Sequence, residues 1–241
     1  MECLLVTDVM TNAVMTIEWG EKGLNYAIDR GDNVVIIDQL RFSSTVVTAV
    51  ALGFVIEPTS DKSRRTESFS LSPFSFIDKP PRRVVIRSPN GAYLSINAKK
   101  AKNVVYGSLL NASSVGEWIN KENKSVTLVA AGEVDKEQRT PFVQDREIEM
   151  SDGNEIFAIE DFIAAGAISS YSTLKKTDYC LKAEDYFNRV KGNILNEMLS
   201  SASHRYNDSK GRGKDTEFCS KLNVYDIVPK LYFISDIPEI K

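Results

Sequence analysis

Residues 34–53 (VVIIDQLRFSSTVVTAVALG) constrain the fold of this chain more than any other segment. The segment begins with four consecutive β-branched residues, a pattern that favours a strand buried on both faces. From Ser44 to Leu52 the composition is typical of a short helix, and Gly53 marks its end. A buried strand that leads directly into a helix is characteristic of α/β proteins with a parallel sheet, so we expect that fold class here.

The turn between this strand and helix carries Asp38, Arg41, Ser43, Ser44 and Thr45. In open α/β sheets, ligands bind beyond the carboxyl ends of the strands, which is where these side chains would lie. The N–H groups of a helix's first turn have no partners within the helix and lie at its positive end, so they suit a phosphate or a sulfonate. Arg41 can add a two-pronged contact to the same anion. A capped turn without any ligand is the alternative explanation of these residues.

The rest of the sequence alternates between strand and helix patterns, which predicts mostly parallel pairing with right-handed crossovers. At 241 residues and 42% hydrophobic content, the chain can form one domain over residues 1–241, with a candidate subdomain boundary near residues 110–125. Segments 59–81 and 134–154 lack periodicity and are predicted as loops, the first of them lid-like. We predict strands at residues 12–19, 34–37, 54–57, 82–87, 103–106, 125–131 and 224–229, and helices at residues 20–31, 44–52, 91–100, 111–120, 157–168, 182–203 and 216–222.

Two further strand-to-helix turns carry chemically useful residues. Asn90 and Gly91 follow the strand at 82–87, and Ser108 and Asn111 follow the strand at 103–106. If the sheet is parallel, both turns lie at the same edge as Asp38 and line one pocket. Taken singly, each turn is better explained by turn formation and helix capping than by a binding role. Together they make these four residues candidate substrate-binding residues.

Acidic residues at two other places are candidates for catalysis and metal binding. Glu160 and Asp161 fall in the first turn of the helix at 157–168. There they either complement the helix dipole or supply oxygen ligands to a hard cation such as Mg²⁺. Glu133 follows the strand at 125–131 and is a candidate general base or outer ligand. The hypothesis is that Asp38, with Glu160 or Asp161, binds the metal, while Asp38, Arg41, Glu133 and Asp161 form the catalytic set.

Charge and composition exclude several classes of partner. Thirty basic residues against 33 acidic ones give a net charge of −3, so there is no bulk basicity for nucleic acid and no cationic face for a membrane. No segment reaches the roughly 20 apolar residues of a membrane span, and the acidic residue at position 2 does not fit a signal peptide. We therefore expect a cytoplasmic protein whose partners are a small-molecule anionic substrate and further copies of itself in a homo-oligomer.

The chain lacks residues that several known phosphatase and hydrolase mechanisms require. His204 is the single histidine, so paired-histidine metal sites are excluded, and a Ser-His-Asp triad would need His204 itself. A tyrosine-phosphatase loop around Cys219 would need an arginine six residues later, where Tyr225 stands. The Asp-x-Asp motif of haloacid-dehalogenase-like phosphatases is absent, because Leu40 lies two residues after Asp38. A buried structural thiol is the better explanation of Cys219.

A set of short motifs follows one another along nearly the whole chain. They are Trp19-Gly20, residues 34–53, Asn90-Gly91, residues 106–112 (YGSLLNA), residues 130–133 (AAGE), residues 159–161 (IED), Asp215 with Cys219, and Val228-Pro229. Their order and spacing resemble the 2-phosphosulfolactate phosphatase family of coenzyme M biosynthesis. The most specific part is the Asp-x-x-Arg-Phe-Ser-Ser-Thr block that begins at Asp38. The resemblance implies a three-layer α/β/α fold with a mostly parallel or mixed central sheet. It also implies a Mg²⁺-dependent phosphatase that converts 2-phosphosulfolactate to 3-sulfolactate and phosphate.

Two departures from the family's pattern leave other functions open. Residues 88–92 read SPNGA where family members usually carry Thr-Asn-Gly-Thr, so a hydroxyl is missing at Ala92. The family's glycine-rich stretch is replaced by a Ser- and Phe-rich segment that ends near Ser72-Pro73. The alternatives are a phosphatase for a different phosphorylated hydroxy acid and a non-catalytic anion-binding relative. Within a phosphatase, Asp38 acts either as a metal ligand or as a covalent nucleophile.

Overall fold

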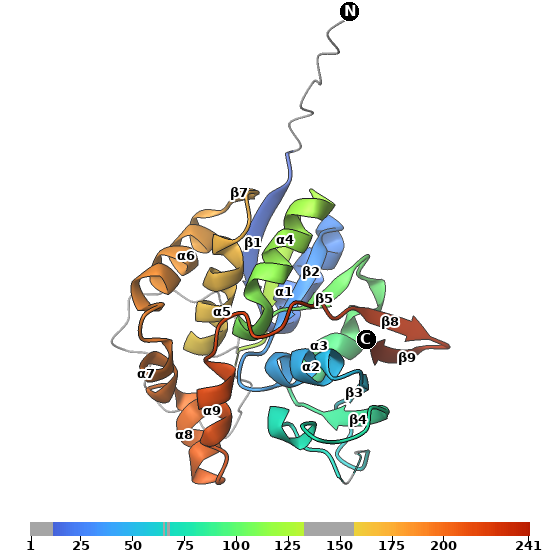
Figure 1. Ribbon diagram of the computed structural model, residues 1–241. Helices are drawn as coiled ribbons and strands as arrows, with labels where there is room; N and C mark the ends of the chain where they lie inside the picture. Colours follow the sequence, from blue (N-terminus) through green and yellow to red (C-terminus); the bar gives the residue numbers. More distant parts are fainter. Residues whose placement is uncertain (1–11, 65, 67, 133–156) are drawn as a thin grey trace, which may run out of the picture.

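The central sheet has five strands in the order β5-β2-β6-β1-β7, and the neighbouring strands are parallel (Figure 1). The protein is described by a computed structural model that covers residues 12–64, 66, 68–132 and 157–241. Four of the predicted strands are confirmed in this sheet, and the two-residue strand β7 was not predicted. The strands are β1 (Val14–Trp19), β2 (Asn33–Ile37), β5 (Val104–Tyr106), β6 (Val126–Ala130) and β7 (Lys175–Lys176).

Helices cover both faces of this sheet, as the alternation of side chains along β2 requires. Val34 and Ile36 pack into a hydrophobic cluster with α1, α2 and α3, whereas Val35 and Ile37 pack into a second cluster with α4, α5 and α6. The expected three-layer α/β/α class is therefore confirmed. The helices are α1 (Gly20–Arg30), α2 (Phe42–Ala51), α3 (Gly91–Asn97), α4 (Ala112–Glu122), α5 (Ile159–Ser170) and α6 (Asp178–Val190).

A second sheet lies beside the first, which the sequence pattern did not predict. Its strands run in the order β4-β3-β9-β8, with β3 and β4 parallel and the β8–β9 hairpin antiparallel. A single bridge from Val105 to Lys230 links the chain of this hairpin to β5. The strands are β3 (Val55–Thr59), β4 (Arg83–Arg87), β8 (Leu231–Ile234) and β9 (Ile237–Ile240).

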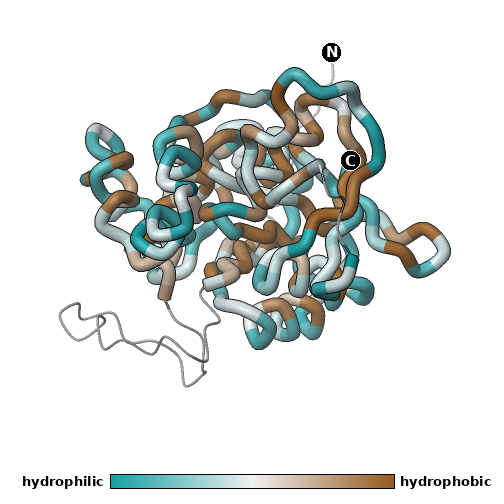
Figure 2. The backbone as a smooth tube through the Cα atoms, turned by 90° about the horizontal axis from the view of Figure 1, so that it is seen from below, coloured by the Kyte–Doolittle hydropathy of each residue, from teal (hydrophilic) through white to brown (hydrophobic). Residues whose placement is uncertain are grey.

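The strand predicted at residues 224–229 is wrong, and the β8–β9 hairpin takes its place. Residues 224–229 run past β5 without joining a ladder: Pro229 accepts a hydrogen bond from the Tyr106 N–H but has no N–H to return one. The hairpin projects from the body in Figure 1, and in Figure 2 hydrophobic colour lies on its strands beside the polar tip, Ser235-Asp236. Ile234 and Ile237, which flank that tip, are both exposed.

The prediction of one long helix at residues 182–203 is also wrong, because a hydrogen-bonded cap at Ser201 starts a new helix within this range. α6 ends at Val190, and Ser201 caps a separate helix by accepting a hydrogen bond from the His204 N–H. The helices that follow α6 are α7 (Ile194–Leu199), α8 (Ala202–Ser209) and α9 (Lys214–Cys219). None of the helices in the described residues has the length and apolar character that crossing a membrane requires.

The loop predicted at residues 59–81 is anchored to the fold by a few buried residues in its described part, whereas residues 60–64 and 77–81 are exposed. Phe69 and Phe76 are buried, and their ring centroids lie 5.5 Å and 5.1 Å from that of Phe54. A short 3-10 turn, η1 (Pro73–Ser75), adds the buried Pro73. The second predicted loop, at residues 134–154, lies outside the described residues.

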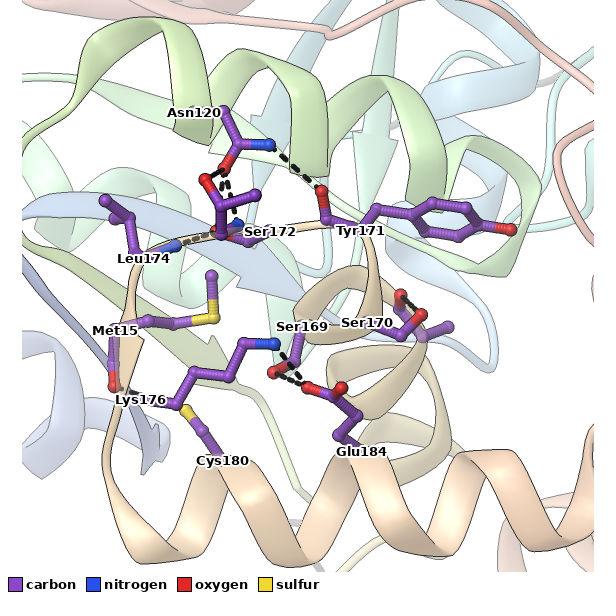
Figure 3. Close-up of polar contacts among 12 residues, drawn as sticks. Met15, Asn120, Ser169, Ser170, Tyr171, Ser172, Leu174, Lys176, Cys180 and Glu184 are labelled. Carbon is purple, nitrogen blue, oxygen red and sulfur yellow. Dashed lines mark hydrogen bonds and ion pairs between the residues drawn. The ribbon is translucent and has the colours of Figure 1, made fainter.

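Polar contacts at the far end of α5 fasten it to its neighbours (Figure 3). On α4, Asn120 Nδ2 donates to the Tyr171 carbonyl at 3.0 Å, and its Oδ1 accepts from Ser172 Oγ at 3.0 Å. On α6, Glu184 accepts from Lys176 Nζ at 2.6 Å and from Ser169 Oγ at 3.1 Å. These contacts hold α5 between α4 and α6, which fixes the direction in which its N-terminal acidic residues point.

Candidate active site

Asp38 leaves the carboxyl end of β2 and joins two of the predicted turns. Its Oδ1 accepts from the Phe42 N–H at 3.0 Å, and its Oδ2 accepts from the Gly91 N–H at 2.9 Å and from Ser88 Oγ at 3.4 Å. The turn at residues 88–91 follows β4 of the second sheet, yet it meets the turn after β2. The side chain is 6% exposed, so the carboxylate is held in place from two directions.

Gly91 has to be a glycine for this contact to form. A Cβ at this position would lie 2.3 Å from Phe42 Cδ1 and 2.8 Å from Asp38 Oδ2. The absence of a side chain therefore lets the backbone of the turn approach the carboxylate closely. The structure uses the predicted substrate-binding residue Gly91 to hold Asp38.

Glu160 and Asp161 come from the first turn of α5 and are both buried. Asp161 Oδ1 accepts from the Gln39 N–H at 2.7 Å, and its Oδ2 accepts from the Gly132 N–H at 3.0 Å. Glu160 is hydrogen-bonded to the hydroxyls of Ser203 and Ser201 at the start of α8. The two carboxylates thus face the turn after β2 on one side and the α7–α9 region on the other.

The three carboxylates repel one another in a buried setting. Burial raises the pKa of Asp38, Glu160 and Asp161, and the charge of Asp38 raises the pKa of the other two further. The effect is strongest at Asp161, whose pKa is also raised by Glu160. The Arg41 guanidinium acts in the opposite direction on the pKa of Asp38. A cation or a proton would therefore be stabilised among these groups.

The same carboxylates supply the oxygen donors that Mg²⁺ prefers, but they do not form a finished cage. In the part of the chain that the structure describes, no three histidine, cysteine or acidic side chains are grouped closely enough to hold a metal by themselves. Mg²⁺ commonly uses only one or two carboxylates and completes its shell with water and substrate phosphate. The donor set of Asp38, Glu160 and Asp161 fits that mode of binding. Glu133, the other acidic candidate, lies outside the described residues.

Arg41 is buried and paired with an acidic residue from a distant helix. Its Nη1 donates to Oδ2 of Asp215 on α9, and Oδ1 of Asp215 accepts from Ser72 Oγ at 2.6 Å. Neither Asp215 nor Ser72 was assigned a role from the sequence. The only signal for Asp215 was its place among the motifs of the resemblance, because nothing local marks an aspartate in a short helix as a partner of Arg41.

The hydroxyls of the turn after β2 are used unequally. Ser43 Oγ accepts from the Asp38 N–H at 2.9 Å and donates to the Ile36 carbonyl at 3.1 Å, and Ser44 Oγ donates to the Gln39 carbonyl at 2.8 Å. Thr45 Oγ1, in contrast, is buried without a hydrogen-bond partner among the described residues. This hydroxyl remains available for a ligand.

The N-terminus of α2 is less open than the sequence suggested. The Phe42 N–H donates to the Asp38 carboxylate and the Ser43 N–H donates to the Asp38 carbonyl at 2.8 Å, so both groups are already paired. The Thr45 N–H donates to the Arg41 carbonyl at 2.9 Å. The N–H groups of Phe42, Ser43 and Thr45 are therefore not free for an anion.

The other two predicted turns differ in what they offer. Asn90 Nδ2 donates to the Gly132 carbonyl at 3.0 Å, while its buried Oδ1 has no partner in the described chain. Ser108 and Asn111 form a capping box, in which Asn111 Oδ1 accepts from the Ser108 N–H at 2.9 Å. Asn111 Nδ2 donates to the carbonyls of Tyr106 and Ile227. Asn90 thus keeps an unused acceptor, whereas Ser108 and Asn111 are committed to their turn.

Gln39 is a site residue that sequence reasoning missed. Its backbone N–H binds Asp161, its Oε1 accepts from the Leu109 N–H at 2.9 Å, and its Nε2 donates to the Cys219 carbonyl at 2.7 Å. The side chain therefore ties the turn after β2 to η3 (Leu109–Asn111) and to α9. No local pattern distinguishes a buried glutamine of this kind from an exposed one.

Cys219 is inert in this setting. Burial raises the pKa of its thiol to about 12, so the thiol is protonated near neutral pH. His204 lies elsewhere in the α7–α9 region, where its Nδ1 is 2.9 Å from Thr216 Oγ1. These positions agree with the exclusion of cysteine- and histidine-based schemes.

Comparison with known proteins identifies the family of this chain. The family model described as 2-phosphosulpholactate phosphatase matches residues 61–232. The chain belongs to the 2-phosphosulpholactate phosphatase family. This family of phosphoric monoester hydrolases is the one that the sequence motifs resemble. The matched range contains Glu160, Asp161 and Asp215 and begins after Asp38 and Arg41.

Curated relatives extend the match over most of the chain. A probable 2-phosphosulfolactate phosphatase of Caldanaerobacter subterraneus subsp. tengcongensis is 27% identical over 232 residues, which cover 83% of this chain and 87% of the relative. A protein of the same name from Carboxydothermus hydrogenoformans is 27% identical and covers 82% and 85% of the two chains. One from Thermotoga petrophila is 28% identical and covers 82% and 88%.

Proposed function

We propose that this protein is a Mg²⁺-dependent phosphatase that hydrolyses 2-phosphosulfolactate to 3-sulfolactate and phosphate. The observation that carries the proposal is the meeting of three buried, mutually repelling carboxylates with the Arg41 guanidinium at the carboxyl end of β2. Such a site stabilises a cation and a phosphoryl group together. The names of the relatives support the substrate, and they would assign the reaction to coenzyme M biosynthesis. A cytoplasmic location and a homo-oligomer remain predictions.

In this proposal Asp38, with Glu160 or Asp161, would hold the metal. When bound, Mg²⁺ would supply charge neutralisation for the phosphoryl oxygens and a more acidic water. Arg41 binds the phosphoryl group through the donors that its pairing with Asp215 leaves over. The unpaired Thr45 hydroxyl and the side-chain oxygen Oδ1 of Asn90 bind polar groups of the same substrate. Because the leaving oxygen needs a proton, the carboxyl that does not bind the metal is suited to hold one through its raised pKa.

The first experiment is phosphate release from 2-phosphosulfolactate and from a panel of phosphorylated hydroxy acids, with Mg²⁺ and with a chelator. We expect Mg²⁺-dependent release that is fastest with 2-phosphosulfolactate and is lost in Asp38→Asn. Asp236 lies on the β8–β9 turn and forms an exposed ion pair with Lys99. Asp236→Asn removes this pair, and as the matched control it should be fully active. Faster release from another compound would change the substrate, and no release at all from folded protein would favour the non-catalytic anion-binding alternative.

A second measurement separates the two roles of Asp38. If Asp38 holds the metal, quenching during turnover should yield no phosphorylated protein. If Asp38 is the nucleophile, an aspartyl-phosphate would accumulate and be detected by mass at the peptide that contains residue 38. The hydrogen bonds from Phe42, Ser88 and Gly91 orient the carboxylate in either case.

A further inference from the structure

The pairing of Arg41 and Asp215 joins parts of the chain that lie far apart in sequence. Arg41 follows β2, and Asp215 lies in α9; their side chains are 6% and 5% exposed. Among the described residues, the bond from Nη1 to Asp215 is the one ion pair or hydrogen bond of the guanidinium. Since a guanidinium carries five N–H donors in a fixed plane, Nε and Nη2 keep donors that Asp215 does not use.

Asp215 is itself held at both carboxylate oxygens. Oδ2 binds Arg41, and Oδ1 accepts from Ser72 Oγ at 2.6 Å. Ser72 directly precedes η1, whose first residue Pro73 is buried, and α9 is fixed by the bond from Gln39 Nε2 to the Cys219 carbonyl at 2.7 Å. Asp215 is therefore held at both carboxylate oxygens before any ligand arrives, and its Oδ2 anchors the Nη1 end of the guanidinium.

Arg41 lies in the same turn as Asp38. The N–H of Phe42, the residue next to Arg41, donates to Asp38 Oδ1 at 3.0 Å, while Nη1 of Arg41 is bound to Asp215. The turn after β2 therefore holds the carboxylate and the guanidinium near each other, and Asp215 anchors the guanidinium from α9.

We infer that Asp215 is a positioning residue that orients Arg41 toward the phosphoryl group of the substrate, and that Ser72 fixes Asp215 for this task. The identity of the substrate in this inference rests on the proposed phosphatase function, whereas the binding of a phosphate anion by Arg41 does not. The pair restricts the rotation of Arg41 and keeps Nε and Nη2 turned to the anion. It also lowers the entropy that a long, free arginine side chain would lose on binding.

The test is a double-mutant cycle on kcat and KM for phosphate release at saturating Mg²⁺. We expect Asp215→Asn to lower kcat/KM roughly 10- to 100-fold, as losses of supporting contacts commonly do. In an Arg41→Ala background the same substitution should cause no further loss, because Asp215 acts through Arg41. Asp215→Glu should recover part of the loss, and the control Asp236→Asn should match the wild type. Losses that multiply in the double variant, or an Asp215→Asn variant within twofold of wild type, would overturn the inference.

Removing one partner of a buried ion pair can unfold a protein, so a second variant is needed. Ser72→Ala keeps both charges and removes only the hydrogen bond to Asp215 Oδ1. It should lower kcat/KM several-fold in the wild-type background and not at all with Arg41→Ala. Melting curves establish that each variant is folded at the assay temperature. If Asp215→Asn is unfolded, Ser72→Ala replaces it in the double-mutant cycle with Arg41→Ala. The criterion stays the same: no further loss of kcat/KM in the Arg41→Ala background.

A binding measurement separates this inference from the proposed reaction. Calorimetric titration with inorganic phosphate in the presence of Mg²⁺ should show weaker binding to Asp215→Asn and Arg41→Ala, with no further weakening in the double variant. If the wild type hydrolyses none of the substrates but the phosphate cycle behaves in this way, the proposed function fails and the role of Asp215 stands. A wild type that does not bind phosphate, or variants that bind it as the wild type does, would overturn the role of Asp215.

Discussion

Substitution of Gly91 by alanine tests whether the close contact between two turns builds the site. An added Cβ would lie 2.3 Å and 2.7 Å from two atoms of the Phe42 ring and 2.8 Å from Asp38 Oδ2. Neither partner can yield easily, because Phe42 is fully buried and Asp38 is fixed by three hydrogen bonds. The turn at residues 88–91 therefore has to move away from Asp38 and lose the bond from the Gly91 N–H.

The size of the effect follows from three contributions. Overpacking a buried contact costs about 1–3 kcal/mol, and losing a buried hydrogen bond to a charged group costs about 1.5–3 kcal/mol. Replacing glycine by alanine in the first turn of α3 returns up to about 1 kcal/mol through helix propensity. We expect Gly91→Ala to lower the free energy of unfolding by about 1.5–6 kcal/mol. We also expect it to lower kcat/KM about 100-fold, because the Asp38 carboxylate loses the Gly91 hydrogen bond that orients it.

Urea denaturation at unchanged m-value measures the stability, and phosphate release measures the activity. Gly192→Ala is the control, because no atom lies within 4 Å of a Cβ added there. It should change the stability by no more than about 0.5 kcal/mol. A Gly91→Ala protein as stable and as active as the wild type would refute the argument that this contact positions Asp38.

Three further predictions concern charge and reactivity. The raised pKa of Asp161 favours its protonated form in the folded state, so the metal-free protein should lose stability as the pH rises from near 3.8 through that raised pKa. Melting temperatures measured with a chelator across this pH range should fall less in Asp161→Asn than in the wild type. A parallel fall in both proteins would contradict the assignment. At higher pH, Asp161→Asn should need more Mg²⁺ for half-maximal phosphate release, and unchanged metal dependence would remove Asp161 from the ligands. Cys219, whose thiol pKa is raised to about 12, should resist alkylation in the native protein and react only after denaturation, as peptide mass mapping would reveal; rapid labelling of native protein would show that the thiol is accessible.

The sequence predicts the central sheet well because its signals are local. The β-branched run before Asp38 marks β2, and the following Gly53 marks the end of α2 within two residues. The sequence fails where long-range pairing decides the structure. Nothing in the composition of β3 and β4 shows that they leave the central sheet for a second one, and the periodicity after Lys182 continues across the breaks that separate α6, α7 and α8.

The candidate site divides in the same way. Asp38, Glu160 and Asp161 could be found because a carboxylate beside a strand end or in a first helical turn is visible in the sequence. Their convergence could only be expected if the turns share an edge. Asp215, Ser72 and Gln39 could not be found by this reasoning, since their roles come from partners far along the chain.

The position of β9 between β3 and β8 has a consequence for synthesis of the chain on the ribosome. Ile56 of β3 pairs with Ile240 of β9, so this sheet joins residues that are 184 positions apart in the sequence. During translation, β3 and β4 can pair early, whereas the other edge of β3 stays open until the hairpin emerges. That open edge is a point at which nascent chains could associate with one another. The yield of refolded protein should therefore fall as the protein concentration during refolding is raised.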